Sequence, residues 1–431
     1  MWAPPNRGAM GLDSIDRKPL VTAQQVLHWV SEKNPGAALS VEALLERLPE
    51  KYRSHFVLQY KSFSNHSANG THPRVIFFGP DAKLLLAFSG LQSDPHYNTI
   101  EMIEYQPATA SFSFYSVHFQ PKGTAKVEIN PPDCKRCHGQ DPKPNWEPYS
   151  LWPGTFGSLH DRILPGTEEY SWFESFLKSF SQSSRYRHLP FPFFVRDKNS
   201  GKPSNYYLSQ LGASPSSSLS ILLGFLNRDR LVKKLISSSW HSWYRPALTA
   251  AMLNCPDPID RFVPKAFVDD HTLSFSETLK ETKTFLAKDF SRKVRALIND
   301  LKTNKDLILT HADRYGLRTS EVERISKLRF LIQKRKGGFE FVRWPLSISK
   351  TSLDFNDGVG GLENLLGHYV ELAYEPEHPV RKAQLLRHVP FSFTSLDSTE
   401  SGAYSVDTFS LVADPNPICD LLFQEAQAIS F

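Results

Sequence analysis

Apolar and polar residues alternate with a period of two between Arg74 and Asn130. Because successive side chains of a β-strand point to opposite faces, this pattern predicts strands. Pro, Gly and Asp residues that favour turns separate the stretches, which is typical of an antiparallel meander. The predicted strands are Val75–Phe78, Lys83–Phe88, Thr99–Tyr105, Ser111–Phe119 and Ala125–Ile129.

Apolar residues recur at helical spacing before this meander. Thr22 and Gln25 form a capping box at the start of one predicted helix, and Pro35-Gly36 ends it. The apolar residues of this helix are Val26, Leu27 and Val30, and those of a second predicted helix are Val41, Leu44, Leu45 and Leu48.

Helical spacing returns after the meander, with a Pro- and Ser-rich linker predicted around Ser214–Ser220. Lys334-Arg335-Lys336 before Gly337 is typical of a helix C-terminus rather than of a nucleic-acid site. The predicted helices are Glu168–Phe180, Ile221–Ser238, Tyr244–Leu253, a long helix from the Ser274/Glu277 capping box to about Lys302, and one that opens at Ser320/Glu323.

Together these elements predict an α+β fold that is predominantly helical and contains one antiparallel β-meander. Four regions follow from the pattern: an N-terminal helical region (1–72), the meander (73–130), a Pro- and aromatic-rich segment with helices (131–260), and a mostly helical C-terminal region (261–431).

Composition excludes some classes of protein. The 50 Lys and Arg residues nearly balance 45 Asp and Glu residues, so the net charge of +5 argues against a protein that coats nucleic acid. Charged residues break the apolar run from Ile221, and no run approaches the ~20 apolar residues of a membrane helix. We expect no nucleic-acid partner and no transmembrane segment.

Two of the four cysteines stand three positions apart and precede a histidine, in Cys134-Lys135-Arg136-Cys137-His138. Haem is attached through two thioether bonds at this pattern. Thiols about one helical turn apart reach two vinyl groups of one porphyrin edge, and the adjacent imidazole then ligates the iron. We therefore expect Cys134 and Cys137 to attach haem c and His138 to bind its iron.

With Gly139 after the histidine, this motif resembles that of c-type cytochromes. The surrounding 131–133 and 141–146 resemble the Pro- and aromatic-rich setting of haem segments in larger bacterial envelope proteins. The resemblance implies a mono-haem electron-transfer protein of the periplasm or cell envelope, with residues 131–260 as the haem-attachment segment. Di-haem c-type peroxidases carry two such motifs and this chain has one, so electron transfer is favoured over catalysis.

Other uses of the cysteine pair stay open. A thioredoxin-type redox pair has this spacing but needs a βαβ setting with the first thiol at a helix start. A structural zinc site needs a second compact pair of ligands, and Cys255 and Cys419 are isolated in the sequence. The remaining alternatives are an ordinary disulfide, reduced thiols, and a haem-based sensor or oxidoreductase with an open distal site.

Two tryptophans that follow the motif, Trp146 and Trp152, are candidates for covering the porphyrin, together with Tyr149 and Phe156. Flat aromatic side chains exclude water from a porphyrin face and thereby tune its potential. The same residues also suit the core of an ordinary loop.

The second axial ligand of the iron is open. Small class I cytochromes place a Met downstream of the motif, but no Met lies between Gly139 and Ala251. An open, five-coordinate iron is one possibility. The candidate ligands are Met102, Met252, His160, His188 and His118, of which His118 shares a predicted strand face with Phe112, Phe114 and Ser116.

The remaining cysteines bear on the compartment. In the oxidising compartment where haem is attached, Cys255 and Cys419 can pair into a disulfide, and two buried thiols are the equal alternative that the sequence leaves open. Residues 1–20 lack the apolar region and cleavage site of a secretory signal. We therefore expect that a signal has been removed or that the start is assigned too far downstream. The sequence does not identify the redox partner.

Overall fold

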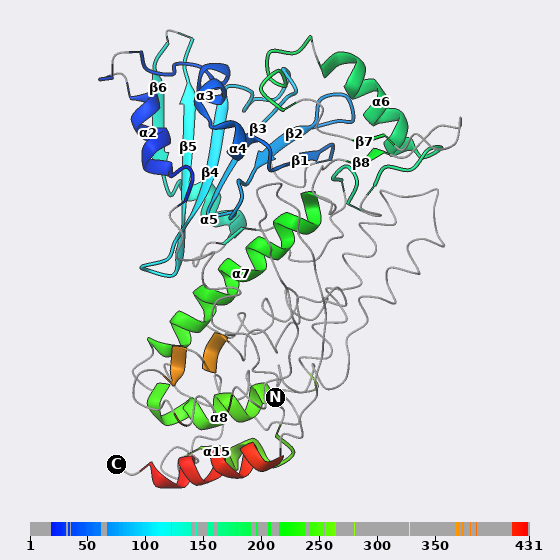
Figure 1. Cartoon of the computed structure of the whole chain (residues 1–431). Helices are drawn as coiled ribbons and strands as arrows, with labels where there is room; N and C mark the ends of the chain where they lie inside the picture. Colours follow the sequence, from blue (N-terminus) through cyan, green and yellow to red (C-terminus); the bar gives the residue numbers. More distant parts are fainter. Residues whose placement is uncertain are drawn as a thin grey trace, which may run out of the picture. The chain divides into compact units, whose positions relative to one another are not determined.

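The computed structural model (Figure 1) shows two compact units, with the boundary between Leu226 and Asn227. It describes residues 19–31, 33, 34, 36–61, 67–121, 123–138, 143, 144, 154–158, 162–180, 182–190, 195, 196, 206, 207, 215–237, 241–253, 255–263, 280, 327, 368–370, 372–374, 380, 385 and 416–429.

A six-stranded antiparallel sheet, with its strands in sequence order, forms the centre of the N-terminal unit (Figure 1). Five strands confirm the predicted meander, with ends that differ by no more than one residue. The predicted strands do not include β1, whose four residues are all buried and show no alternation. The strands are β1 (Phe56–Gln59), β2 (Arg74–Phe77), β3 (Leu84–Phe88), β4 (Thr99–Gln106), β5 (Ser111–Phe119) and β6 (Ala125–Ile129).

Helices cover one side of this sheet, which we call the first face. They are α2 (Ala23–Val30), α3 (Val41–Arg47), α4 (Glu50–Arg53) and α6 (Glu168–Phe180). The predicted capping box starts α2, since Thr22 Oγ1 accepts a hydrogen bond from the Gln25 amide at 3.1 Å. The core on this face includes Val26, Leu44, Leu58, Phe77, Leu86, Met102, Val117 and Phe173.

The opposite side of the sheet, the second face, carries the alternate residues of the same strands. The first half of α7 (Pro215–Ile236) packs in this core. The core includes Val57, Leu85, Tyr105, Phe112 and Phe114 from the sheet, and Leu219, Leu222, Leu223 and Leu226 from α7.

The predicted linker around Ser214–Ser220 is wrong, because α7 already begins at Pro215. Proline suits the first position of a helix, where its missing N–H has no intrahelical partner and its fixed φ matches the helix. The Ser-rich composition therefore marks the first turns of α7.

Three helical elements supply much of the core of the C-terminal unit: α8 (His241–Leu253), η2 (Ile259–Phe262) and α15 (Asn416–Ala428). α8 begins three residues before its predicted start and continues through Pro246. Polar contacts accompany this apolar packing. His241 Nε2 lies 2.7 Å from the Tyr369 hydroxyl, and Arg245 pairs with Glu425 of α15 at 3.0 Å.

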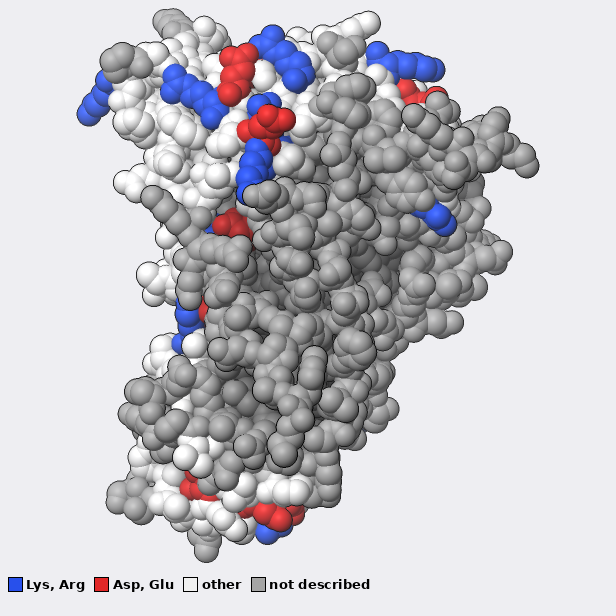
Figure 2. All heavy atoms as spheres, in the orientation of Figure 1, with Lys and Arg blue, Asp and Glu red and all other residues white. Residues whose placement is uncertain are grey.

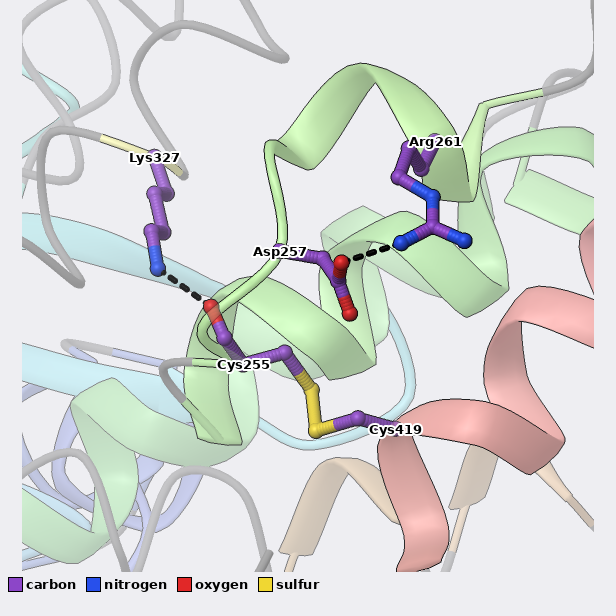
Figure 3. The surroundings of a disulfide bond; sticks show 5 residues. All are labelled: Cys255, Asp257, Arg261, Lys327 and Cys419. Atoms are coloured by element: carbon purple, nitrogen blue, oxygen red, sulfur yellow. Dashed lines mark hydrogen bonds and ion pairs between the residues drawn. A yellow bond between two sulfur atoms is a disulfide. The ribbon is translucent and has the colours of Figure 1, made fainter. Parts of the chain in front are cut away.

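A disulfide joins Cys255 to Cys419 of α15, which is one of the two alternatives that the sequence leaves open (Figure 3). Their Cα atoms lie 5.8 Å apart although the residues are 164 positions apart in the sequence. The Lys327 ammonium donates to the Cys255 carbonyl at 2.7 Å. The disulfide therefore holds α15 to the segment that follows α8.

The described elements form a mixed α+β fold, and a short pair of strands, β7 (Val195–Arg196) and β8 (Tyr206–Tyr207), completes them. Apart from Lys280 and Lys327, the helices predicted after residue 270 lie outside the described residues. Across the described ranges, no helix has both the length and the apolar character required to cross a membrane. On the face in Figure 2, described basic and acidic side chains lie beside one another.

Loss of the Cys255–Cys419 disulfide is expected to destabilise the C-terminal unit. A loop of 164 residues corresponds to about 5 kcal/mol in the chain-entropy model, and typical measured contributions are about 2–4 kcal/mol. The double variant Cys255→Ser/Cys419→Ser should unfold at lower urea than wild type. A reductant should lower the wild-type midpoint and leave that of the variant in place; equal midpoints for all samples would contradict the role of the bond.

Candidate functional site

The cysteine–histidine motif lies in the short helix α5 (Pro132–His138), which follows β6. Asn130 makes the connection in a left-handed conformation with φ of +50°, which asparagine adopts more readily than most residues. Its N–H donates to the Phe114 carbonyl at 2.7 Å, and its Oδ1 accepts from the Phe114 N–H at 2.9 Å. These bonds fix the start of α5 beside β5.

The helical backbone places the three motif residues together. Positions i, i+3 and i+4 lie on one side of a helix, and this is the spacing of Cys134, Cys137 and His138. Cys134 packs against the second-face core, and the His138 ring lies 4.6 Å from the Phe114 ring, centroid to centroid. The side chain of Cys137 is outside the described part. The motif therefore lies against the apolar second face.

A hydrogen bond determines which nitrogen of His138 carries the proton. His138 Nδ1 lies 2.6 Å from the backbone carbonyl of Lys143. Because a carbonyl oxygen only accepts, Nδ1 is the donor and Nε2 of the neutral ring keeps its lone pair. Metal-ligating histidines are characteristically held in this way, with the second nitrogen bonded to a carbonyl or carboxylate.

Burial keeps this imidazole neutral. It lowers the pKa of His138 from its ordinary value of 6.5, more than the Lys143 hydrogen bond and the Glu101 carboxylate raise it. Arg74 also lowers this pKa, and its guanidinium pairs with Glu101 at 2.6 Å. Both charged residues belong to the second face, because they alternate with first-face residues on β2 and β4. His138 thus has an apolar wall at Phe114 and a paired charge nearby.

These features fit a c-type haem. The site offers a neutral imidazole with its Nε2 lone pair available, two cysteines at helical spacing, and an apolar wall. Cys134 and Cys137 are the residues that would hold the porphyrin, and His138 is the one that would bind the iron.

The structure describes one of the four aromatic residues that were candidates for covering the porphyrin. Trp146 and Trp152, with Tyr149, lie outside the described residues. Phe156 is buried in the first-face core, 5.3 Å from Phe173 between ring centroids. Cys134 packs against the second-face core, on the other side of the sheet. Phe156 therefore belongs to an ordinary apolar core and does not cover the motif.

Two of the candidates for the second axial position lie away from the second face. Met102 is buried in the first-face core, on the other side of the sheet from Cys134. His188 is followed by Leu189, which packs in that same first-face core. Its pKa is lowered, mainly by burial.

The other candidates differ in what the structure shows. Met252 is buried in the core of the C-terminal unit, and His160 is outside the described residues. His118 lies on the second face, because it alternates on β5 with Val117 and Phe119 of the first-face core. Its Nδ1 is 3.1 Å from Thr99 Oγ1, and it is four residues, about 13 Å of strand, from Phe114. Of the described candidates in the N-terminal unit, only His118 shares the face of the motif.

Comparison with known proteins adds no relative, since no family model, no curated protein and no solved structure matches this chain. Within the part that the structure describes, no three His, Cys, Asp or Glu side chains gather into a metal-binding group. The chemistry of the motif is therefore argued from α5 and its surroundings.

Three neighbours of the motif are not identified by the sequence: Phe114, Asn130 and Lys143. Asn130 had a recognisable signal, because an asparagine before Pro131 and Pro132 is typical of a turn. Lys143 acts through its backbone carbonyl, so its residue type carries no signal.

Substitution of Asn130 tests its role in positioning α5. Asn130→Ala should lower the free energy of unfolding by about 1–3 kcal/mol, because it leaves the Phe114 N–H without its acceptor and places a Cβ-bearing residue at positive φ. Asn130→Gly loses the same acceptor but tolerates the backbone conformation, so it should be less destabilising. Urea unfolding measures both variants, and a wild-type value for Asn130→Ala would contradict this role.

Proposed function

We propose that this chain is a mono-haem c-type protein that transfers electrons. The observation that carries the proposal is the state of His138, which directs its Nδ1–H to the Lys143 carbonyl and lies one helical turn after Cys134. A half-buried, neutral imidazole held in this tautomer is prepared to ligate a metal. The motif spacing selects haem among the possible metals and cofactors.

Each residue of the site has a distinct task in this proposal. Cys134 and Cys137 would retain the porphyrin through thioether bonds, and His138 would bind the iron through its Nε2. The Lys143 carbonyl orients the imidazole and raises its basicity, while Phe114 limits rotation of the ring. The bound haem supplies the redox chemistry, through its Fe(II) and Fe(III) states.

The second axial position separates electron transfer from sensing. Because His118 is on the same sheet face as Phe114, it is the described candidate that best suits a six-coordinate iron. His118→Ala should then convert a low-spin spectrum of the holoprotein to a high-spin one. A high-spin wild-type spectrum that this variant does not change would instead favour an open site of a sensor or oxidoreductase.

The location that we propose is the periplasm or cell envelope. The Cys255–Cys419 disulfide supports it, because disulfides form and persist in oxidising compartments. The redox partner is proposed to be a protein, with no role for nucleic acid. We also propose that helix predominates over the whole chain and that residues 131–260 are its haem-attachment segment after the meander.

A second candidate function, a thiol redox pair without haem, draws support from the place of Cys134. It is the third residue of α5, and a helix start lowers the pKa of a cysteine thiol. Against this reading, the sheet is antiparallel throughout its described strands, whereas a thioredoxin-type pair requires a βαβ unit.

Export-directed expression with a haem-maturation system tests the proposed function. We expect haem staining that survives a denaturing gel, with about one haem per chain by pyridine haemochrome spectrum. Cys134→Ser and Cys137→Ser should reduce the stain, and Cys255→Ser, the matched control, should retain it. A haem-free wild-type band would overturn the proposal and favour the thiol pair.

The binding of the iron by His138 is tested separately from the covalent attachment of haem to the cysteines. His138→Ala keeps both cysteines, so it should retain some covalent haem while the absorption spectrum loses the signature of the native axial ligand. An unchanged spectrum in this variant would contradict the assignment of His138.

A further inference from the structure

The two edges of the six-stranded sheet differ in how they are covered. Residues 154–158 cover β1: Thr155 bridges to Gln59, and the Phe156 N–H donates to the Leu58 carbonyl at 2.9 Å. At the other edge, β6 pairs only with β5 among the described strands. Its side chains are also exposed, with Val127 at 37% and Ile129 at 61% of their full accessible area. Within the part of the chain that the structure describes, the edge of β6 is therefore open to another strand.

The side chains of β6 differ on its two faces. Val127 and Ile129 pair in register with Val117 and Tyr115 and share the first face. Lys126 and Glu128 pair with His118 and Ser116 and share the second face. The Lys126 ammonium and the Glu128 carboxylate lie 2.6 Å apart. Apolar residues thus project from one face and a cation and an anion from the other.

We propose that two copies of this chain associate through antiparallel pairing of their β6 strands, with the two-fold axis at Val127. In a two-fold interface, if residue i of one copy contacts residue j of the other, then residue j of the first copy also contacts residue i of the second. This register places Val127 opposite Val127 of the second copy, and Lys126 opposite Glu128 in both halves. Ala125 then stands opposite Ile129. Opposite charges directly across a strand pair stabilise it, as do apolar pairs.

The sequence of β6 favours a second copy over an unrelated strand. Lys126 and Glu128 stand symmetrically about Val127. When β6 pairs with its own antiparallel copy, each cation therefore faces the anion of the other copy. Exposed Leu39 lies beside Gly123, in the turn between β5 and β6. Since β6 has only five residues, we expect concentration-dependent association rather than an obligate dimer.

A cysteine at the proposed axis tests the register in the full chain. In Val127→Cys, the substituted positions of two copies stand directly opposite, about 4.5–5.5 Å apart between Cβ atoms, so mild oxidation should give a reducible dimer. Ile129→Cys is the matched control, because its two substituted positions are four residues, about 13 Å, apart along the strands. Ile129 is the more exposed of the two side chains. Random collision therefore predicts faster cross-linking of Ile129→Cys, and that result would overturn the proposal.

Charge exchange tests the same interface without cysteines. Lys126→Glu and Glu128→Lys each place like charges opposite one another twice, so each should weaken dimerisation, by roughly tenfold, in sedimentation equilibrium. The double variant Lys126→Glu/Glu128→Lys exchanges both charges and should restore wild-type association. A wild-type chain that stays monomeric at all concentrations, or single variants that dimerise like wild type, would contradict the proposed pairing.

Discussion

Alternation of side chains through one antiparallel sheet is the constraint on which the N-terminal unit depends. Leu58, Phe77 and Met102 enter the first-face core, while their neighbours Val57 and Ile103 contact the second-face core. A shift of any strand by one residue would exchange these sets, so burial on both sides fixes the register. The same alternation decides which groups share the face of the cysteine–histidine motif.

The site combines this sheet face with a short helix held at a defined place. Asn130 bonds twice to Phe114, and Phe114 in turn contacts the ring of His138. The Lys143 carbonyl fixes the tautomer of the same ring. A strand residue, a turn residue and a backbone carbonyl thus prepare one imidazole nitrogen. Such support orients a metal ligand before the metal binds.

Much of this fold could be predicted where the sequence has a clear period. β2, β4 and β5 alternate between buried and partly exposed residues over most of their length, so their positions follow from the sequence, whereas β1 is buried throughout and has no such signal. β3 is also buried throughout, and the Pro, Gly and Asp residues that flank it predict its position. The Thr22 capping box could also be predicted, because it depends only on residues within one helical turn. The Ser-rich start of α7 resembles a linker, and only its packing in the second-face core identifies it as helix.

The candidate site could be predicted in part. The spacing of Cys134, Cys137 and His138 is local, so the sequence identifies the motif. Met102 lies on the opposite face of the sheet from the motif, and predicting this requires the strand register, which involves residues far apart in the chain. The Cys255–Cys419 pairing likewise depends on tertiary contacts, because the sequence offers the two thiols but no distance between them.

Intact-protein mass spectrometry of exported, matured protein, followed by sequencing of the peptide that contains residues 134–138, tests the central claim most directly. The account predicts one added haem mass per chain, located on that peptide and resistant to denaturation, with Cys255 and Cys419 recovered as a disulfide-linked pair. An unmodified mass, with Cys134 and Cys137 both recovered as thiols or joined to each other, would contradict it.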